Sequence, residues 1–218
     1  MIKGVFSLYR DRAPFFLELL AQHALITLIS ISIITVVGFC LGLLMTKHKL
    51  IAGILLRLTS FLYTIPSIAL FGILVSITGI GMKSAVIAIV LYGLLPMIRS
   101  TYTSLVEVPA DIIEAAVGMG TAKGQLLVNI RLPLALPVIF SGFRTTVVMT
   151  IALTGIASFI GAGGMGRAVW RGISTNYPEM TIAGSFLIAL MAILSDLVLE
   201  FVERRVRIRF LGEEGVST

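Results

Sequence analysis

A chain of 218 residues, 57% hydrophobic and only 13% charged, has too much apolar surface for an ordinary soluble domain. The mean hydropathy of +1.05 instead indicates a bundle of membrane-spanning helices, with too little length left for a soluble catalytic domain. A net charge of +6 would suggest nucleic acid in a soluble protein. Here the basic residues flank apolar runs, as in membrane topology, so no nucleic-acid partner is expected.

Five apolar runs have a length close to the roughly 20 residues that a membrane-spanning helix needs. In chain order they cover about residues 24–46, 55–77, 84–98, 137–160 and 180–202, and the third is short. The expected fold is therefore an all-α membrane protein with five transmembrane helices. Residues 1–22 are expected to form a polar leader, 23–203 the transmembrane domain and 204–218 a basic tail. The first run lacks an A-x-A cleavage site, which favours a retained helix over a signal peptide.

Basic residues near helix ends indicate the orientation, because Lys and Arg favour the cytoplasmic side. An odd number of spans puts the two termini on opposite sides of the membrane. With the N-terminus outside, the cytoplasmic segments hold Lys47, Lys49, Arg57, Arg99, Lys123, Arg131, Arg204, Arg205, Arg207 and Arg209. The outer segments then hold Lys3, Arg10, Arg12, Lys83, Arg167 and Arg171. This asymmetry favours an N-out, C-in topology, although the basic leader counts against it.

A few charged residues fall inside the apolar runs, where an ionised group costs at least a few kcal/mol. Arg57, Arg99, Arg144, Asp196 and Glu200 are all expected within about two turns of a cytoplasmic helix end. A pairing such as Arg144 with Asp196 would offset their desolvation. Structural anchoring is the favoured interpretation, and a direct role in substrate handling is the alternative.

The segment 108–133 is too polar to span a membrane and too patterned to be a simple linker. Pro109 suits the first position of a short helix, whose apolar stripe would hold Ile112, Ile113 and Ala116. Thr121 is expected to cap a second helix carrying apolar residues on one side, which Leu132-Pro133 would end. The sequence therefore predicts two short helices between the third and fourth spans.

The spacing of residues in this segment resembles the signature loop of binding-protein-dependent ABC importer permeases. Glu114-Ala115-Ala116 is followed after three residues by Gly120, after nine more by Ile130, and after one more by Leu132-Pro133. Every position of the motif is matched. The resemblance extends from about Thr27 to Glu203 and implies the transmembrane fold of a type I importer.

Within that family, the chain looks most like permeases for the osmoprotectants glycine betaine, choline and carnitine. The stretches that carry this likeness are 64–70 (TIPSIAL), 91–96 (LYGLLP), 114–120 (EAAVGMG), 132–139 (LPLALPVI) and 159–166 (FIGAGGMG). Methionine importers share the Glu-Ala-Ala loop and a similar glycine-rich stretch. A permease for methionine or another amino acid is therefore the nearest alternative.

The resemblance implies partners that the chain itself lacks. A cytoplasmic ABC ATPase dimer would use ATP and Mg²⁺, a second permease copy or paralogue would complete the pore, and an extracytoplasmic binding protein would deliver the solute. A coupling helix would dock in a groove of the ATPase, with Glu114 facing it, Ala115 and Ala116 keeping the helix slim, and Gly120 permitting a tight turn. The full set of expected coupling residues is Glu114, Ala115, Ala116, Gly120, Ile130, Leu132 and Pro133. The location implied is the cytoplasmic (inner) membrane of a bacterium or archaeon.

The glycine-rich stretch 161–166 follows a spanning helix and lacks Gly-Lys-Ser/Thr, so it is not expected to bind nucleotide phosphates. By resemblance it would lie near an external gate and the docked binding protein. Aromatic rings attract quaternary ammonium ions, but Trp170 and Tyr177 fit better as membrane-interface anchors. The candidate residues for a translocation path or gate are Tyr63, Pro66, Tyr92, Arg144, Gly161, Gly163 and Gly164.

No catalytic or metal site is expected in this chain. His23 and His48 are the only histidines and are far apart, and Cys40 is the only cysteine. The chain is therefore interpreted as a permease without a cofactor of its own and not as an enzyme. An ATP-independent channel or secondary carrier remains the alternative from another class.

Overall fold

The computed structural model describes residues 2–211, and this part of the chain is almost entirely helical. The elements are α1 (Ile2–Asp11), α2 (Ala13–Lys47), α3 (Lys49–Thr64), α4 (Ser67–Thr78), α5 (Met82–Val106), α6 (Ala110–Gly118), α7 (Lys123–Gln125), the π-helix η1 (Leu126–Arg131), α8 (Leu132–Ala157), the 3₁₀ turn η2 (Ser158–Ile160), α9 (Gly166–Ser174) and α10 (Pro178–Leu211). Of the predicted basic tail, 204–211 continue α10, and 212–218 lie outside the described residues.

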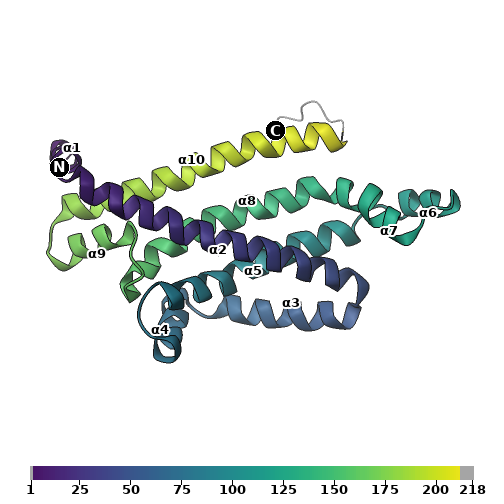
Figure 1. Ribbon diagram of the computed structural model, residues 1–218, viewed down its shortest axis with the longest axis horizontal. Coiled ribbons are helices and arrows are strands. Elements are labelled where there is room, and N and C mark those ends of the chain that lie inside the picture. The colour runs from purple at the N-terminus through teal and green to yellow at the C-terminus, as the bar shows by residue number, and fades with distance from the viewer. Residues whose placement is uncertain (1, 212–218) are drawn as a thin grey trace.

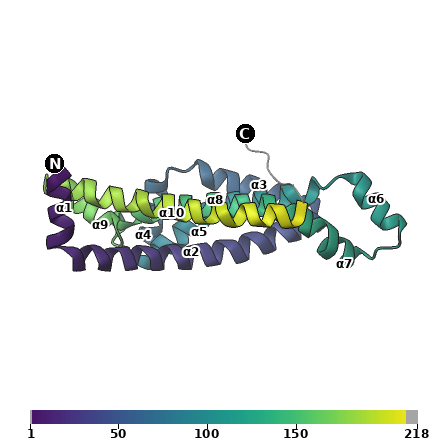
Figure 2. The same cartoon turned by 90° about the horizontal axis from the view of Figure 1, so that it is seen from above.

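The long helices form an elongated bundle (Figure 1). At one end α6 and α7 project beyond the other helices, and at the opposite end α1 and α9 gather around the start of α10 (Figure 2). We refer to these as the α6 end and the α9 end. The part of the molecule that stands clear of the bundle therefore lies within the predicted loop 108–133, which we call the projecting segment.

Four helices, α2, α5, α8 and α10, are long and apolar enough to cross a membrane. A fifth crossing is obtained if the bent pair α3 and α4 is counted as one span. The helices begin and end beyond several predicted bounds: α2 starts at Ala13, well before residue 24, and α5 continues through Pro96 to Val106. The fold class predicted from the sequence is confirmed at this level.

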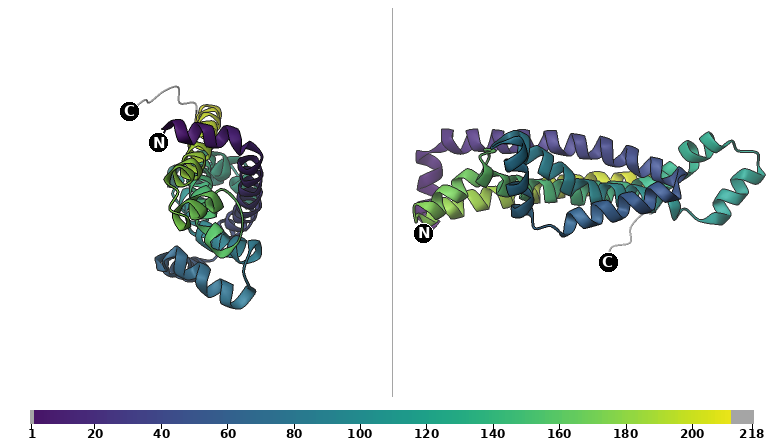
Figure 3. Two further views of the ribbon diagram at one scale, coloured as in Figure 1. Left: turned by 90° about the vertical axis from the view of Figure 1, so that its left-hand side faces the viewer. Right: turned by 90° about the horizontal axis from the view of Figure 1, so that it is seen from below.

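The predicted second span, 55–77, is not one straight helix. It is broken at Ile65-Pro66, and α3 and α4 meet at an angle of 100°, so that α4 runs across the bundle (Figure 3). Pro66 has no N–H group and pushes Ile65 into extended conformation (φ −71°, ψ 128°). The Ile65 carbonyl that is freed by the break accepts a hydrogen bond from the Tyr92 hydroxyl of α5. A backbone group that would be unpaired in an apolar environment is thereby satisfied.

The contact between α2 and α5 is made close by glycines. A Cβ atom at Gly38 would lie 2.7 Å from Met97 Cγ, and one at Gly42 would lie 2.6 Å from Thr101 Cβ. Neither position has room for a larger residue. Ile34, fully buried, fills the matching space beside Gly93 of α5. This small-residue seam sets the backbone distance between the two helices.

Candidate functional site

The first short helix of the projecting segment, α6, presents an exposed surface. Pro109 lies at its N-cap, one position earlier than predicted, and Asp111 is in its first turn. Glu114 and Ala115 are exposed, whereas Ala116 is buried. The predicted apolar stripe is therefore only partly buried. Large apolar side chains remain exposed on the projecting segment, namely Ile112, Val117, Met119 and Val128, of which Met119 is 80% exposed.

Gly120 ends α6 in a Schellman motif. The Thr121 N–H donates to the Ala116 carbonyl at 3.1 Å, and the Gly120 N–H donates to the Val117 carbonyl at 2.9 Å. This pair of bonds requires a residue with left-handed backbone between them, and Gly120 has φ +83°. The tight turn expected at Gly120 is present. Its physical reason is backbone conformation, because a Cβ atom there would meet nothing within 4 Å.

The second half of the projecting segment differs from the prediction. Thr121 does not cap a helix; the N-cap is Ala122, whose N–H donates to Gln125 Oε1 at 3.3 Å. The helix also does not end at Leu132-Pro133, because η1 leads directly into α8. Pro133 lacks an N–H, and its ring would crowd the carbonyl of residue 129 in a regular α-helix. The wider π turn accommodates it.

Because of this continuity, the projecting segment is joined stiffly to a spanning helix. Leu132 and Leu127 pack against the main hydrophobic core, and Ile130 is half-buried. The residues 130, 132 and 133 of the expected motif thus lie at the junction between the loop and α8, whereas residues 114, 115 and 120 lie on its exposed tip. The uninterrupted helix runs from Lys123 through η1 into α8, and α6 is attached to it through the tight turn at Gly120.

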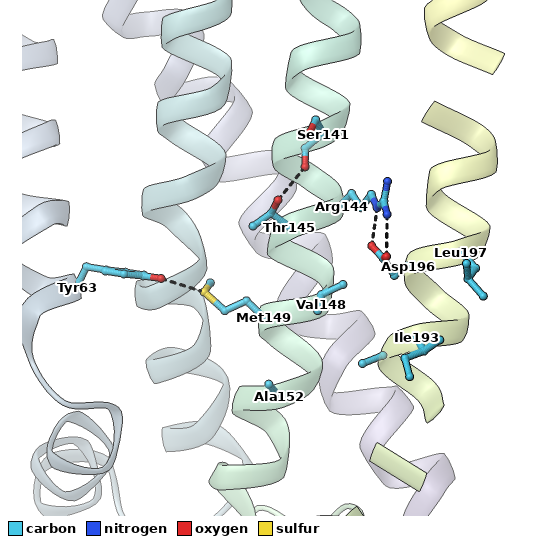
Figure 4. Close-up of a pocket in the computed structure, with 11 residues that line it drawn as sticks. Tyr63, Ser141, Arg144, Thr145, Val148, Met149, Ala152, Ile193, Asp196 and Leu197 are labelled. Carbon is cyan, nitrogen blue, oxygen red and sulfur yellow. Dashed lines mark hydrogen bonds and ion pairs between the residues drawn. The ribbon is translucent and has the colours of Figure 1, made fainter. Parts of the chain in front are cut away.

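Arg144 lies on α8 and makes ion pairs with three carboxylates of α10, of which Figure 4 shows the one with Asp196. Its guanidinium bonds Asp196 in a bidentate manner, with Nε–Oδ1 2.5 Å and Nη2–Oδ2 2.7 Å. It also approaches Glu200 at 3.2 Å and Glu203 at 3.4 Å. The predicted pairing of Arg144 with Asp196 is therefore confirmed. Arg144 lies deeper than predicted, about three turns into α8, since that helix starts at Leu132.

A cleft of about 700 Å³ lies beside this ion-pair cluster, between the end of α3, α8 and α10. Tyr63 and Arg144 both line it. The Tyr63 hydroxyl reaches Met149 Sδ at 3.6 Å, and its ring stands edge-on to Tyr92, 5.8 Å between centroids. Four of the predicted path residues, Tyr63, Pro66, Tyr92 and Arg144, thus belong to the region of the α3–α4 break and this cleft. The three predicted glycines do not.

The glycines lie at the α9 end, in the loop between η2 and α9. Gly161, Gly163 and Gly164 all have positive φ, from +77° to +91°, so the loop follows a path that other residues rarely adopt. Two residues of α2 hold it. Gln22 Oε1 accepts the Gly164 N–H at 3.2 Å, and His23 Nδ1 accepts the Met165 N–H at 3.3 Å.

His23 is a residue whose role the sequence did not indicate. It is fully buried, and its Nε2 lies 3.1 Å from the Ile151 carbonyl of α8. With Nδ1 accepting and Nε2 donating, both bonds form only with a neutral ring. The signal available in the sequence was a Gln-His pair entering an apolar run. His23 joins α2, α8 and the glycine-rich loop at one point.

These features define a class of protein. At one end of a bundle of spanning helices, a helical projection is continuous with a spanning helix, and at the other end lies a fixed glycine-rich loop. Between them is a largely apolar cleft beside an ion-pair cluster, and the whole arrangement is that of a membrane transport permease. Residues 34–208, most of the chain, match the family described as binding-protein-dependent transport system inner membrane component. The chain belongs to this family and is a multi-pass inner-membrane permease component.

Three transport permeases that are similar in sequence to this chain support the assignment. The osmoprotectant import permease protein OsmW of Salmonella typhimurium is 41% identical over 194 residues, covering 87% of this chain and 90% of the relative. The glycine betaine/carnitine/choline transport system permease protein OpuCD of Bacillus subtilis is 35% identical, covering 90% and 86%. The ergothioneine transport permease/ergothioneine binding protein EgtU of Helicobacter pylori is 42% identical over 75% of this chain. The match spans only 30% of that relative's own length.

Solved transporters share the fold. An inward-facing structure of the MetNI methionine ABC transporter matches with a TM-score of 0.75 at 20% identity, covering 90% of this chain and 98% of the other. A crystal structure of an amino acid ABC transporter with histidines matches with a TM-score of 0.79 at 17% identity, covering 92% and 98%. At these identities the likeness concerns the fold alone, which is the transmembrane fold of a type I ABC importer.

Proposed function

We propose that this chain is the permease subunit of an ATP-driven importer of small quaternary ammonium solutes, such as glycine betaine, choline and carnitine. The observation that carries the proposal is the chemistry shared by its relatives. Glycine betaine, carnitine, choline and ergothioneine, named for relatives at 35% to 42% identity, all contain a trimethylammonium group. OsmW, named for osmoprotectants, is similar over nearly its whole length.

Coupling to a separate cytoplasmic ATPase is proposed to run through α6. The exposed Glu114 and the apolar side chains around it offer a small mixed surface for a groove on that ATPase. Continuity of η1 with α8 gives that surface a mechanical link to the membrane region. In this proposal the α6 end is cytoplasmic and the α9 end faces outward, so the glycine-rich loop lies near the docked binding protein. ATP and Mg²⁺ belong to the ATPase dimer, and a second permease copy or paralogue completes the path.

The translocation path is proposed to use the cleft lined by Tyr63 and Arg144, together with the α3–α4 break at Pro66 and Tyr92. The exposed ring of Tyr63, 47% accessible, offers a face to a passing cation. Gly161, Gly163 and Gly164 are proposed as part of the outer gate. Arg144 is proposed to hold α8 against α10 beside the path, since its donors are taken up by three carboxylates.

A permease for methionine or another amino acid is the second candidate, because the solved structures that share this fold are a methionine and an amino acid ABC transporter. A substrate panel separates the two. The permease, reconstituted in liposomes with its cognate ATPase and binding protein, is tested with radiolabelled glycine betaine, choline, carnitine, ergothioneine and methionine. We expect ATP-dependent uptake of at least one trimethylammonium compound and none of methionine. Uptake of methionine alone would overturn the proposed substrate class.

A further inference from the structure

A second pocket, of about 670 Å³, lies at the α9 end between α2, the glycine-rich loop and α9. Its charged lining consists of Arg167 and Arg171, and no carboxylate side chain lines it. Within residues 2–211 neither guanidinium makes an ion pair, whereas Arg144 in the other cleft is paired three times. Glu18 is near in sequence to the lining residue Gln22, but it is engaged by the Gln22 side-chain amide at 2.9 Å. The pocket therefore offers two guanidinium groups that are free to bind an anion.

Aromatic surface lies beside these guanidinium groups. Trp170, on the same helix as the two arginines, lines the pocket and is 52% exposed. Its ring stands edge-on to Phe159, with centroids 5.0 Å apart. Phe15 of α2 lies under Arg171, 5.9 Å from the guanidinium carbon to the ring centroid. An indole next to arginines can hold an organic cation whose anionic end is bound by the arginines.

The wall formed by the glycine-rich loop is held in place. A Cβ atom at Gly163 would lie 2.7 Å from Gln22 Oε1, and one at Gly161 would lie 2.8 Å from Ile80 Cγ2, so glycine allows both close approaches. The hydrogen bonds of Gln22 and His23 to residues 164 and 165 fix the loop against α2. A binding wall that is already ordered loses little entropy when a small ligand binds.

We propose that this pocket binds zwitterionic trimethylammonium solutes at the outer mouth of the permease. Arg167 and Arg171 bind the solute's carboxylate, and Trp170 faces its trimethylammonium group. This inference rests on the proposed function and narrows it: choline, which has the cation but no carboxylate, is not retained here, whereas glycine betaine and carnitine are. The planar guanidinium group of arginine can donate two hydrogen bonds to one carboxylate, whereas the ammonium group of a lysine acts as a point charge.

Trp170 is the only tryptophan of the chain, so its fluorescence reports this pocket directly. Full-length permease in detergent micelles is titrated with glycine betaine and, at equal chloride concentration, with choline. We expect a saturable change of Trp170 emission with glycine betaine, and at least about tenfold weaker binding of choline, the factor expected when charge-assisted hydrogen bonds are lost.

The variant R167Q/R171Q should lose the response to glycine betaine, and R167K/R171K should retain a weakened one. The matched control is R10Q/R12Q, which removes two exposed basic residues of the same end that do not line the pocket. Equal responses to glycine betaine and choline, the absence of any saturable response in the wild type, or an unchanged response in R167Q/R171Q would each overturn the inference. Failure of the proposed function is seen separately, as the absence of ATP-dependent uptake of every trimethylammonium compound by the wild type.

Discussion

Gly120 and Gly118 lie two residues apart in the projecting segment, but only Gly120 has a backbone conformation that favours glycine. Neither would bring a new Cβ atom within 4 Å of another group, but Gly120 has φ +83° and Gly118 is helical. A β-branched residue at position 120 should therefore cost roughly 1–2 kcal/mol through strain alone. The Schellman turn would open and the exposed tip of α6 would lose its fixed direction.

We predict that Gly120→Val uncouples transport, so that more ATP is hydrolysed per solute imported in proteoliposomes. Gly118→Val is the matched control and should keep the wild-type ratio. Measuring phosphate release and solute uptake in the same vesicles checks both. A wild-type ratio of ATP hydrolysed to solute imported in the Gly120→Val variant would show that coupling does not depend on the conformation of this turn.

Arg144 is surrounded by more negative charge than it carries, so its removal should be costly. Arg144→Gln would leave Asp196 without an ion-pair partner, whereas Glu200 and Glu203 would keep their pairs with Arg204 and Arg207. We expect a lower melting temperature, with a smaller effect than for fully buried pairs because the cluster is partly exposed. Arg204, which pairs with Glu200 but is 74% exposed, provides the control Arg204→Gln. Thermal unfolding in detergent should separate the two variants, and equal melting temperatures would contradict this account.

Among the elements, α2, α8 and the glycine-rich loop meet at His23. Replacing this residue removes the bond to the Ile151 carbonyl and leaves the Met165 N–H without its acceptor in a buried place, at a cost of about 2 kcal/mol. We predict that His23→Leu lowers the melting temperature and exposes the chain to trypsin after Arg167, at the start of α9. His48→Leu, which changes the other histidine in an exposed turn, should do neither. Identical melting temperatures and cleavage of the two variants would contradict the conclusion that His23 holds the glycine-rich loop against α2 and α8.

At the same scale, the sequence predicted the helices better than their breaks and junctions. Hydropathy located the five apolar runs because it measures which segments avoid water, but it is insensitive to backbone direction, so the 100° bend at Pro66 was missed. Pro133 was expected to end a helix because proline interrupts regular α-helical hydrogen bonding. In the structure a π turn lets η1 continue into α8. The Arg144–Asp196 pair was predictable, since an unpaired charge in an apolar run is costly. The His23 contacts join segments more than 120 positions apart, and the Gln-His pair at the start of an apolar run did not indicate their partners.

For the whole molecule, the charge distribution predicts the orientation, with the α6 end in the cytoplasm and the α9 end outside. Cys40 is the only cysteine, so a Cys40→Ser background allows one reporter thiol at a time. We expect a membrane-impermeant maleimide to label Ser174→Cys, exposed at the end of α9, in intact cells. Lys123→Cys, exposed at the start of α7, should be labelled only after the cells are opened. The reverse pattern would invert the topology and place α6 out of reach of an ATPase.

The central claim is that this bundle moves solute only when a partner hydrolyses ATP. The most direct measurement is accumulation of radiolabelled glycine betaine in liposomes that contain the permease and its ATPase, with ATP in the ATPase compartment and binding protein on the opposite side. The account predicts accumulation above the starting concentration when ATP and binding protein are both present, and none when either is omitted. Uptake that persists without both would contradict it and would identify a channel or secondary carrier.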